Sequence, residues 1–208
     1  MAGRFTGWPE GAFDVLLQLE GEPSQSVREK CRKEREQLVR QPMIALLNDL
    51  ADRDAAYDDF SVWHYRTNSW WWQHQGAVIR LARNIEIGLR FDLDGLRIQG
   101  AWWYPVPEQI RKFRQAVAAD GSGRELAVIV EELRKREYEV TGDLMKRVPR
   151  DHPADHQRAE LLRHRSLIAV RPLGCDGWLH TPAAVDVVLD AVGDLSEMMS
   201  WLVRHVKV

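Results

Sequence analysis

Cysteine is scarce in this chain, which has only Cys31 and Cys175 among its 208 residues. Cys31 lies in a charged, helix-like run and Cys175 in the turn-like stretch 174–177. Neither has a further ligand at the spacing of a zinc site. Two distant thiols are typical of a reducing compartment rather than of a disulfide-stapled scaffold. We therefore expect reduced cysteines and a cytoplasmic protein.

The chain also lacks an excess of charge of either sign. Its 29 Lys and Arg residues face 31 Asp and Glu residues, which gives a net charge of −2. Proteins dedicated to nucleic acids rely on an excess of basic residues, so no nucleic-acid partner is expected. No window approaches the roughly 18 apolar residues of a membrane span, and the first residues have no apolar signal core. No membrane association is expected either.

Common catalytic and cofactor motifs are missing. The sequence has no G-x-S-x-G motif, no phosphate-binding glycine loop and no dinucleotide fingerprint. We therefore expect no cofactor, and leave open whether the protein is an enzyme.

Hydrophobic periodicity indicates a sheet bracketed by helices. Apolar and polar residues alternate over 85–91 and 96–102, on both sides of Asp94-Gly95, a dipeptide typical of two-residue hairpin turns. This pattern predicts an antiparallel hairpin over residues 90–102. Further strands are expected at 60–65, 138–140 and 167–170.

Helices are predicted around this sheet. The mixed-charge run 28–40 is typical of a solvated helix face, and Pro42 should interrupt the helix before residues 43–50 continue it. One further short helix is expected to start near Pro9. Four others are expected over residues 107–117, 124–136, 153–164 and 182–205. The fold class is therefore α+β: one domain over residues 1–208, with an antiparallel sheet and a central hairpin bracketed by helices.

Three stretches, residues 5–19, 100–120 and 142–166, resemble a mainly bacterial family known as domain of unknown function 2461. The third stretch carries the most specific pattern of this family. Its positions are Met145, Lys146, Arg147, Pro149, Asp155, His156, Leu161, Leu162, Arg163 and Arg165. The resemblance implies a single-domain soluble protein and brings no assigned reaction.

The chain departs from this family in one segment. The family's hallmark is Arg-x-x-Arg-Asp-x-Arg-Phe followed by a lysine, and it should fall on residues 61–72. Here those positions hold Ser61, His64, Tyr65, Thr67, Asn68 and Trp72. The resemblance therefore implies that an ionic segment has been exchanged for an aromatic one.

Residues 146–171 contain a local excess of positive charge. Seven Lys and Arg residues face Asp151, Asp155 and Glu160. Basic side chains beside a helix N-terminus can bind an anion, and Lys146, Arg147 and Arg163 are the candidate ligands. Alternatively, these residues pair with acidic neighbours in the fold.

The run 151–156, Asp-His-Pro-Ala-Asp-His, contains two histidines at the spacing of a helical metal pair. Because Pro153 places the expected helix start between them, no metal site is predicted. His156, beside Asp and Arg residues, is the candidate general acid or base. The simpler structural alternative is that Asp151 caps the helix and that Asp155 is a first-turn acid favoured by the helix dipole.

Tryptophan is abundant, with nine residues, and Trp70, Trp71 and Trp72 are consecutive. Three adjacent side chains cannot all face the core. Those outside the core could line a pocket for a planar or apolar ligand, or form an exposed dimer surface. Core packing explains the other tryptophan side chains. The candidate ligand-binding residues here are His64, Tyr65, Trp70, Trp71, Trp72 and Trp102, with His64 or His74 as a polar contact.

These observations lead to two expectations about function. The first is a protein that binds a small organic ligand with an anionic group, in an aromatic-walled pocket edged by Lys and Arg. The second is a non-catalytic interaction or accessory protein that uses a Trp-rich surface, for which a homodimer is one form.

Overall fold

The computed structural model describes residues 4–65 and 68–208 of the chain, so Thr67 lies outside the described residues. The chain divides into two compact units. Unit one comprises Met1–Ile79, Gly88–Ile98 and Pro172–Ala191, and unit two comprises Arg80–Ile87, Gln99–Arg171 and Val192–Val208. The expectation of a single domain stays a prediction.

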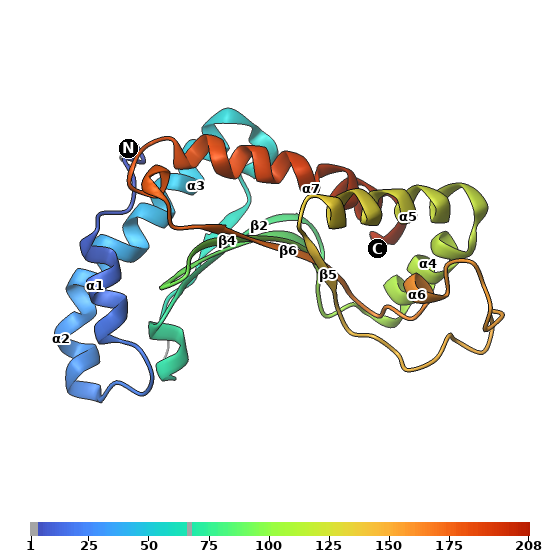
Figure 1. The fold of residues 1–208 in the computed structure, drawn as a ribbon, viewed down its shortest axis with the longest axis horizontal. Coiled ribbons are helices and arrows are strands. Elements are labelled where there is room, and N and C mark those ends of the chain that lie inside the picture. The colour runs from blue at the N-terminus through green and yellow to red at the C-terminus, as the bar shows by residue number, and fades with distance from the viewer. Residues whose placement is uncertain (1–3, 66–67) are drawn as a thin grey trace. The chain divides into compact units, whose positions relative to one another are not determined.

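The described strands form one antiparallel sheet of six strands in the order β1-β2-β3-β4-β6-β5 (Figure 1). At one edge, Phe60 pairs with Ile79, and at the other Glu139 pairs with Val170. With helices packed around this sheet, the predicted α+β class is confirmed. The strands are β1 (Phe60–Val62), β2 (Gln75–Ala82), β3 (Ile85–Asp92), β4 (Gly95–Trp102), β5 (Glu139–Thr141) and β6 (Leu167–Gly174).

The predicted hairpin is present as β3 and β4, but its turn lies one residue earlier than expected, at Leu93 and Asp94. The Asp94 backbone N–H donates to Asp92 Oδ1 at 3.0 Å. Gly95 opens β4 with φ +93°, and a Cβ there would overlap the carbonyl of Gly174. Glycine is therefore required by this close approach as well as by the backbone angle.

A second hairpin, between β2 and β3, was missing from the sequence prediction. Residues 75–79 of β2 are all buried, so this strand has no alternation of apolar and polar residues. Its turn contains Asn84 at φ 64°. The Asn84 side-chain amide donates to Tyr104 O at 2.9 Å, within unit two. Asparagine tolerates this left-handed conformation better than most residues.

In unit one, a single helical rod replaces the two helices expected around Pro42. It consists of α2 (Gln25–Arg35), a π-helical turn (Glu36–Arg40) and α3 (Gln41–Arg53), and it follows α1 (Gly11–Gln18). The interruption predicted at Pro42 is wrong. Proline cannot donate a backbone hydrogen bond to the preceding turn. That turn is π-helical and already departs from the α-helical hydrogen-bond pattern, so the helix continues through Pro42.

Unit two is built on helices packed around aromatic side chains. Trp102, Phe113 and Trp201 are fully buried, with the Phe113 ring 4.9 Å from that of Trp102 and 5.8 Å from that of Trp201. The helices are α4 (Pro107–Ala118), α5 (Asp120–Lys135) and α6 (Ala159–Leu162), together with part of α7 (Ala184–Val206).

The helix predicted over residues 153–164 is wrong, because only α6 is helical there. Arg158 explains the difference. Its side chain is buried, and its guanidinium donates to Val117 O at 2.6 Å and Ala118 O at 2.9 Å. These carbonyls lie at the end of α4, where no intrahelical partner remains. The hydrogen bonds of Arg158 to these carbonyls therefore favour the observed backbone over the longer helix that the local sequence predicts.

The same junction explains why α5 begins at Asp120 rather than at residue 124. A Cβ at Gly123 would overlap Val117 O and would lie 2.6 Å from Arg158 Nε. Glycine therefore allows the first turn of α5 to approach the end of α4. The early start places Gly121 and Gly123 inside the helix.

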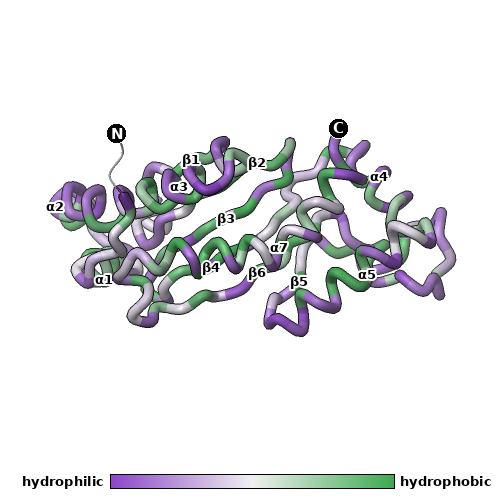
Figure 2. The backbone as a smooth tube through the Cα atoms, turned by 90° about the horizontal axis from the view of Figure 1, so that it is seen from above, coloured by the Kyte–Doolittle hydropathy of each residue, from purple (hydrophilic) through white to green (hydrophobic). Residues whose placement is uncertain are grey.

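Hydropathy follows the elements of the fold. Figure 2 shows hydrophilic residues predominating along α2 and hydrophobic residues along β3. In the described part of the chain, we find no helix with the length and apolar character needed to cross a bilayer.

Candidate functional site

A cleft of about 590 Å³ lies in unit two, between α4 and the segment that precedes β6. We call it the α4 cleft. Three guanidinium groups and one carboxylate face it, beside an apolar floor. The lining residues are Pro107, Ile110, Arg111, Arg114, Gln115, Ala118, Asp151, His152 and Arg165.

The helical repeat of α4 builds one wall of this cleft. The α4 lining residues recur at spacings of three and four, which places them on one face of the helix. The opposite face supplies the buried residues Gln109, Phe113, Ala116 and Val117. Arg111 and Arg114 are therefore held on the cleft side because the core fixes the other side of α4.

Arg114 is the unusual side chain of the α4 cleft. It is half-buried, and its Nε is buried without a hydrogen-bond partner among the described residues. Its Nη2 lies 2.8 Å from Met145 Sδ, a weak acceptor. In the described part of the chain no carboxylate pairs with it, so its charge lacks a counterion.

The other charged groups of the cleft have partners. Arg165 pairs with Asp143 at 2.8 Å. His152 Nε2 lies 3.6 Å from the Asp151 carboxylate. The carboxylates in both contacts are exposed, so the electrostatic contribution of each is small and screened by salt. The uncompensated charge of the cleft is therefore centred on Arg114.

The residues predicted from the basic segment occupy different places. Lys146 and Arg147 are exposed and are not among the residues lining the α4 cleft. Arg163 Nε donates to Met145 O at 2.7 Å, and His156 Nδ1 accepts from the Arg158 backbone N–H at 3.0 Å. These contacts give Arg163 and His156 structural roles. Their predicted roles in binding or proton transfer stay predictions.

The aromatic segment forms a cluster in unit one, which we define as Trp63, Tyr65, Trp70, Trp71, Trp72 and His74. Residues Ser69–Trp72 form a 3-10 helix, capped where Asn68 Oδ1 accepts from the Trp70 N–H at 2.9 Å. The three consecutive indoles diverge, since Trp72 is only 5% exposed whereas Trp70 is 46% exposed. Trp63 is 38% exposed.

A buried arginine fixes the backbone beneath this aromatic cluster. Arg35, at the end of α2, is 1% exposed and donates to Trp72 O at 3.0 Å and to His74 O at 2.6 Å. Its guanidinium also lies 4.7 Å from the ring centroid of Tyr65. Burial lowers the pKa of Arg35 to about 10, so the side chain remains charged at neutral pH. The sequence interpretation of residues 28–40 as a solvated face is wrong for Arg35.

His74 is buried within the aromatic cluster. Its ring centroid lies 4.2 Å from that of Trp70, and its Nδ1 has no hydrogen-bond partner among the described residues. Burial, followed by the charges of Arg90 and Arg35, lowers the pKa of His74 to about 4. The Arg90 guanidinium lies 5.5 Å from the Trp70 ring centroid. The cluster therefore combines neutral rings with positive charge.

The predicted pocket residues belong to both units. His64, Tyr65, Trp70, Trp71 and Trp72 lie in unit one, and Trp102, Lys146, Arg147, His156 and Arg163 lie in unit two. His64 is exposed, with Nε2 3.3 Å from Arg40 Nη2. Trp102 is fully buried, in keeping with the core alternative. A pocket shared by the aromatic and basic residues stays a prediction.

A family model described as "Conserved hypothetical protein (DUF2461)" matches residues 63–201. The chain belongs to the DUF2461 family. The match includes the whole aromatic cluster and the whole α4 cleft, so both are parts of the DUF2461 region. No curated protein and no solved structure matches the chain.

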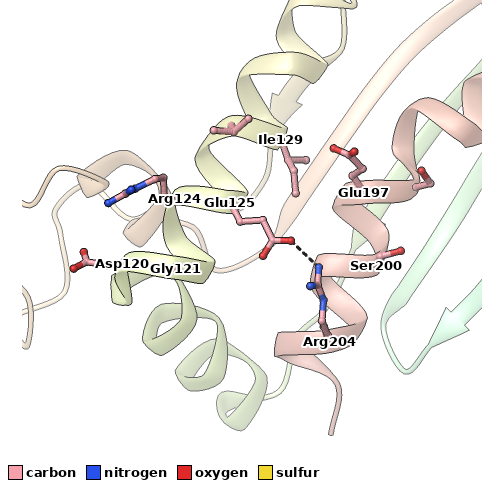
Figure 3. Close-up of a pocket in the computed structure, with 10 residues that line it drawn as sticks. Asp120, Gly121, Arg124, Glu125, Ile129, Glu197, Ser200 and Arg204 are labelled. Carbon is pink, nitrogen blue, oxygen red and sulfur yellow. Dashed lines mark hydrogen bonds and ion pairs between the residues drawn. The ribbon is translucent and has the colours of Figure 1, made fainter.

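This DUF2461 chain has a further groove of about 730 Å³ in unit two, between α5 and α7 (Figure 3). The Glu125 carboxylate points from α5 toward the Arg204 guanidinium of α7, at 2.8 Å. Charges of both signs line the groove, so it does not select for one sign of ligand. Within residues 4–65 and 68–208, no three His, Cys, Asp or Glu side chains gather as metal ligands.

Arg111 and Arg114 are the cleft residues that the sequence analysis missed in this DUF2461 chain. Their signal was available, because they stand three apart on a predicted helix whose core-facing positions could be assigned. The charge count over residues 146–171 drew attention to the other wall of the cleft. That wall does contribute Asp151, His152 and Arg165.

Proposed function

We propose that the protein binds a small organic ligand through an anionic group in the α4 cleft. The observation that carries this proposal is Arg114, a half-buried guanidinium that faces the cleft without a carboxylate partner among the described residues. A planar guanidinium can hold a carboxylate or a phosphate with two parallel hydrogen bonds. A ligand of this kind would supply the missing counterion.

The size and composition of the cleft also support this ligand class. Cavities that hold small molecules typically enclose roughly 300–1,000 Å³ and combine apolar walls with a few polar groups. The α4 cleft encloses about 590 Å³. Pro107, Ile110 and Ala118 offer apolar surface for the organic part of the ligand, while Arg114 supplies the charge for its anionic group.

His152 is the group in the cleft with the chemistry for proton transfer. Imidazole is a common general acid or base, and the Asp151 carboxylate lies 3.6 Å from His152 Nε2. If the bound ligand is transformed, we propose His152 as the acid or base. His152 lines the cleft, whereas His156 is not among the lining residues.

Calorimetric titration of the full chain with succinate and with inorganic phosphate tests the proposal. Replacing Arg114 by Gln should weaken binding roughly ten- to hundredfold, because hydrogen bonds to a charged group contribute about 1.5–3 kcal/mol. The salt dependence of the remaining affinity should also become shallower.

Arg150→Gln is the matched control, since Arg150 is an exposed arginine of the basic segment that does not line the cleft. Its affinities should equal those of the unchanged protein. Equal losses in the two variants would mean that diffuse surface charge, and not the cleft, attracts the anion. Thermal melts by circular dichroism verify that both variants are folded.

A further inference from the structure

We infer that the exposed side of the aromatic cluster is a second binding site, which takes a planar organic anion on Trp70 and its neighbours. Trp70 is 46% exposed, and Trp71 meets it edge-on, with ring centroids 4.9 Å apart and planes at 77°. Trp63 meets Trp71 in the same manner, at 5.6 Å and 72°. Successive rings at nearly right angles form corners, in which a flat ligand ring can stack on one indole and abut the next.

The exposed rings are held in place from beneath. Arg35 hydrogen-bonds to Trp71 O at 3.2 Å and to Trp72 O at 3.0 Å, and Asn68 caps the 3-10 helix. The His74 ring packs against Trp70 at 4.2 Å. A surface that is already ordered loses little conformational entropy when a ligand binds.

The charges near the rings favour an anion. Arg90 lies 5.5 Å from the Trp70 ring centroid, and Arg35 and Arg97 act on His74 with the same sign. Asp92 offsets Arg90 in part, through an ion pair of 2.8 Å. Because the Arg90 guanidinium lies beside the Trp70 ring, the cluster disfavours the quaternary ammonium ligands that aromatic cages otherwise accept. A carboxylate on a flat ring can interact with Arg90 while the ring stacks on an indole.

Three small probes separate shape from charge: benzoate is flat and anionic, cyclohexanecarboxylate is anionic but not flat, and tetramethylammonium is a cation. Binding to the full chain is followed by the indole N–H resonances, assigned with single Trp→Phe variants. Benzoate should shift the Trp70 and Trp71 resonances and bind roughly two- to tenfold more tightly than cyclohexanecarboxylate, the range expected for ring stacking. Tetramethylammonium should shift neither resonance.

Two variants and one control complete the experiment. Trp70→Leu should remove the preference for benzoate, and Arg90→Gln should weaken both carboxylates. Trp178→Leu replaces a half-buried indole of the 3-10 helix Gly177–His180 and should change neither affinity. Trp70 and Arg90 are partly exposed, so both variants should fold, which circular dichroism checks.

Three results would overturn the inference. The first is equal affinity for the two carboxylates. The second is benzoate binding that survives Trp70→Leu and disappears in Arg114→Gln, which would assign this anion to the α4 cleft. The third is a concentration-dependent dimer in size-exclusion chromatography that Trp70→Leu abolishes, without any benzoate shift, which would assign the rings to a second copy of the chain.

Discussion

Acidification should destabilise the protein through His74. This imidazole is 2% exposed in the fold, and burial beside Arg90 and Arg35 lowers its pKa from 6.5 to about 4. In the unfolded chain the same group protonates near its ordinary pKa. Between these two values the unfolded state binds more protons, so the free energy of unfolding falls as the pH falls. Its contribution is complete above about pH 6.5 and lost below about pH 4.

The size of this effect follows from the pKa difference. The difference between a pKa of 6.5 in the unfolded chain and a pKa of about 4 in the fold corresponds to about 3 kcal/mol of unfolding free energy. That is a large part of the stability of an ordinary domain, which is about 5–15 kcal/mol. The loss of stability in acid should therefore be visible well before general acid denaturation.

Urea unfolding at pH 7.5, 5.5 and 4.0, followed by tryptophan fluorescence, measures the loss. Burial also lowers the pKa values of His164 and His205, so these groups add to the acid sensitivity. A His74→Gln variant keeps those contributions and cannot protonate at position 74. Its free energy of unfolding should fall by about 3 kcal/mol less than that of the unchanged protein. Parallel curves for the two proteins would refute the reasoning.

Three substitutions test buried contacts within each unit, by urea unfolding at neutral pH. Arg35→Met should lower the free energy of unfolding by roughly 3 kcal/mol or more, because it leaves the buried carbonyl groups of Trp72 and His74 without a donor. A loss below about 1 kcal/mol would mean that water replaces the guanidinium. Gly123→Ala should cost about 1–3 kcal/mol, since its Cβ would overlap Val117 O, whereas Gly121→Ala, with nothing within 4 Å, should be neutral or stabilising. Equal effects at the two glycines would contradict the close approach of α4 and α5.

Local patterns predicted the parts of the fold that depend on local physics. Alternation on both sides of Asp94-Gly95 correctly located the hairpin of β3 and β4. The strand β2 was not predicted, because residues 75–79 are all buried and the alternation of apolar and polar residues is absent. A continuous apolar run is compatible with either a buried strand or a buried helix.

Long-range hydrogen bonds account for the remaining errors. Arg158 donates to carbonyls about 40 residues away in the sequence, and no local pattern reveals that attachment. Arg35 stands in a run of charged residues, most of them solvated, and differs from its neighbours only in what it meets in the fold. The candidate site also depends on tertiary contacts, because only the fold shows that Arg114 has no carboxylate partner among the described residues.

The π-helical turn Glu36–Arg40 makes the hydrogen bonds between Arg35 and residues 72–74 depend on the number of residues in the helix. Such a turn contains one residue more than the α-helical repeat requires. Deleting one residue from it would restore a regular α-helix and rotate α2 by about 100° relative to α3, the angle per residue of an α-helix. Arg35 would then point away from Trp72 O and His74 O. Loss of the one surplus helical residue would therefore also remove the hydrogen bonds of the buried arginine.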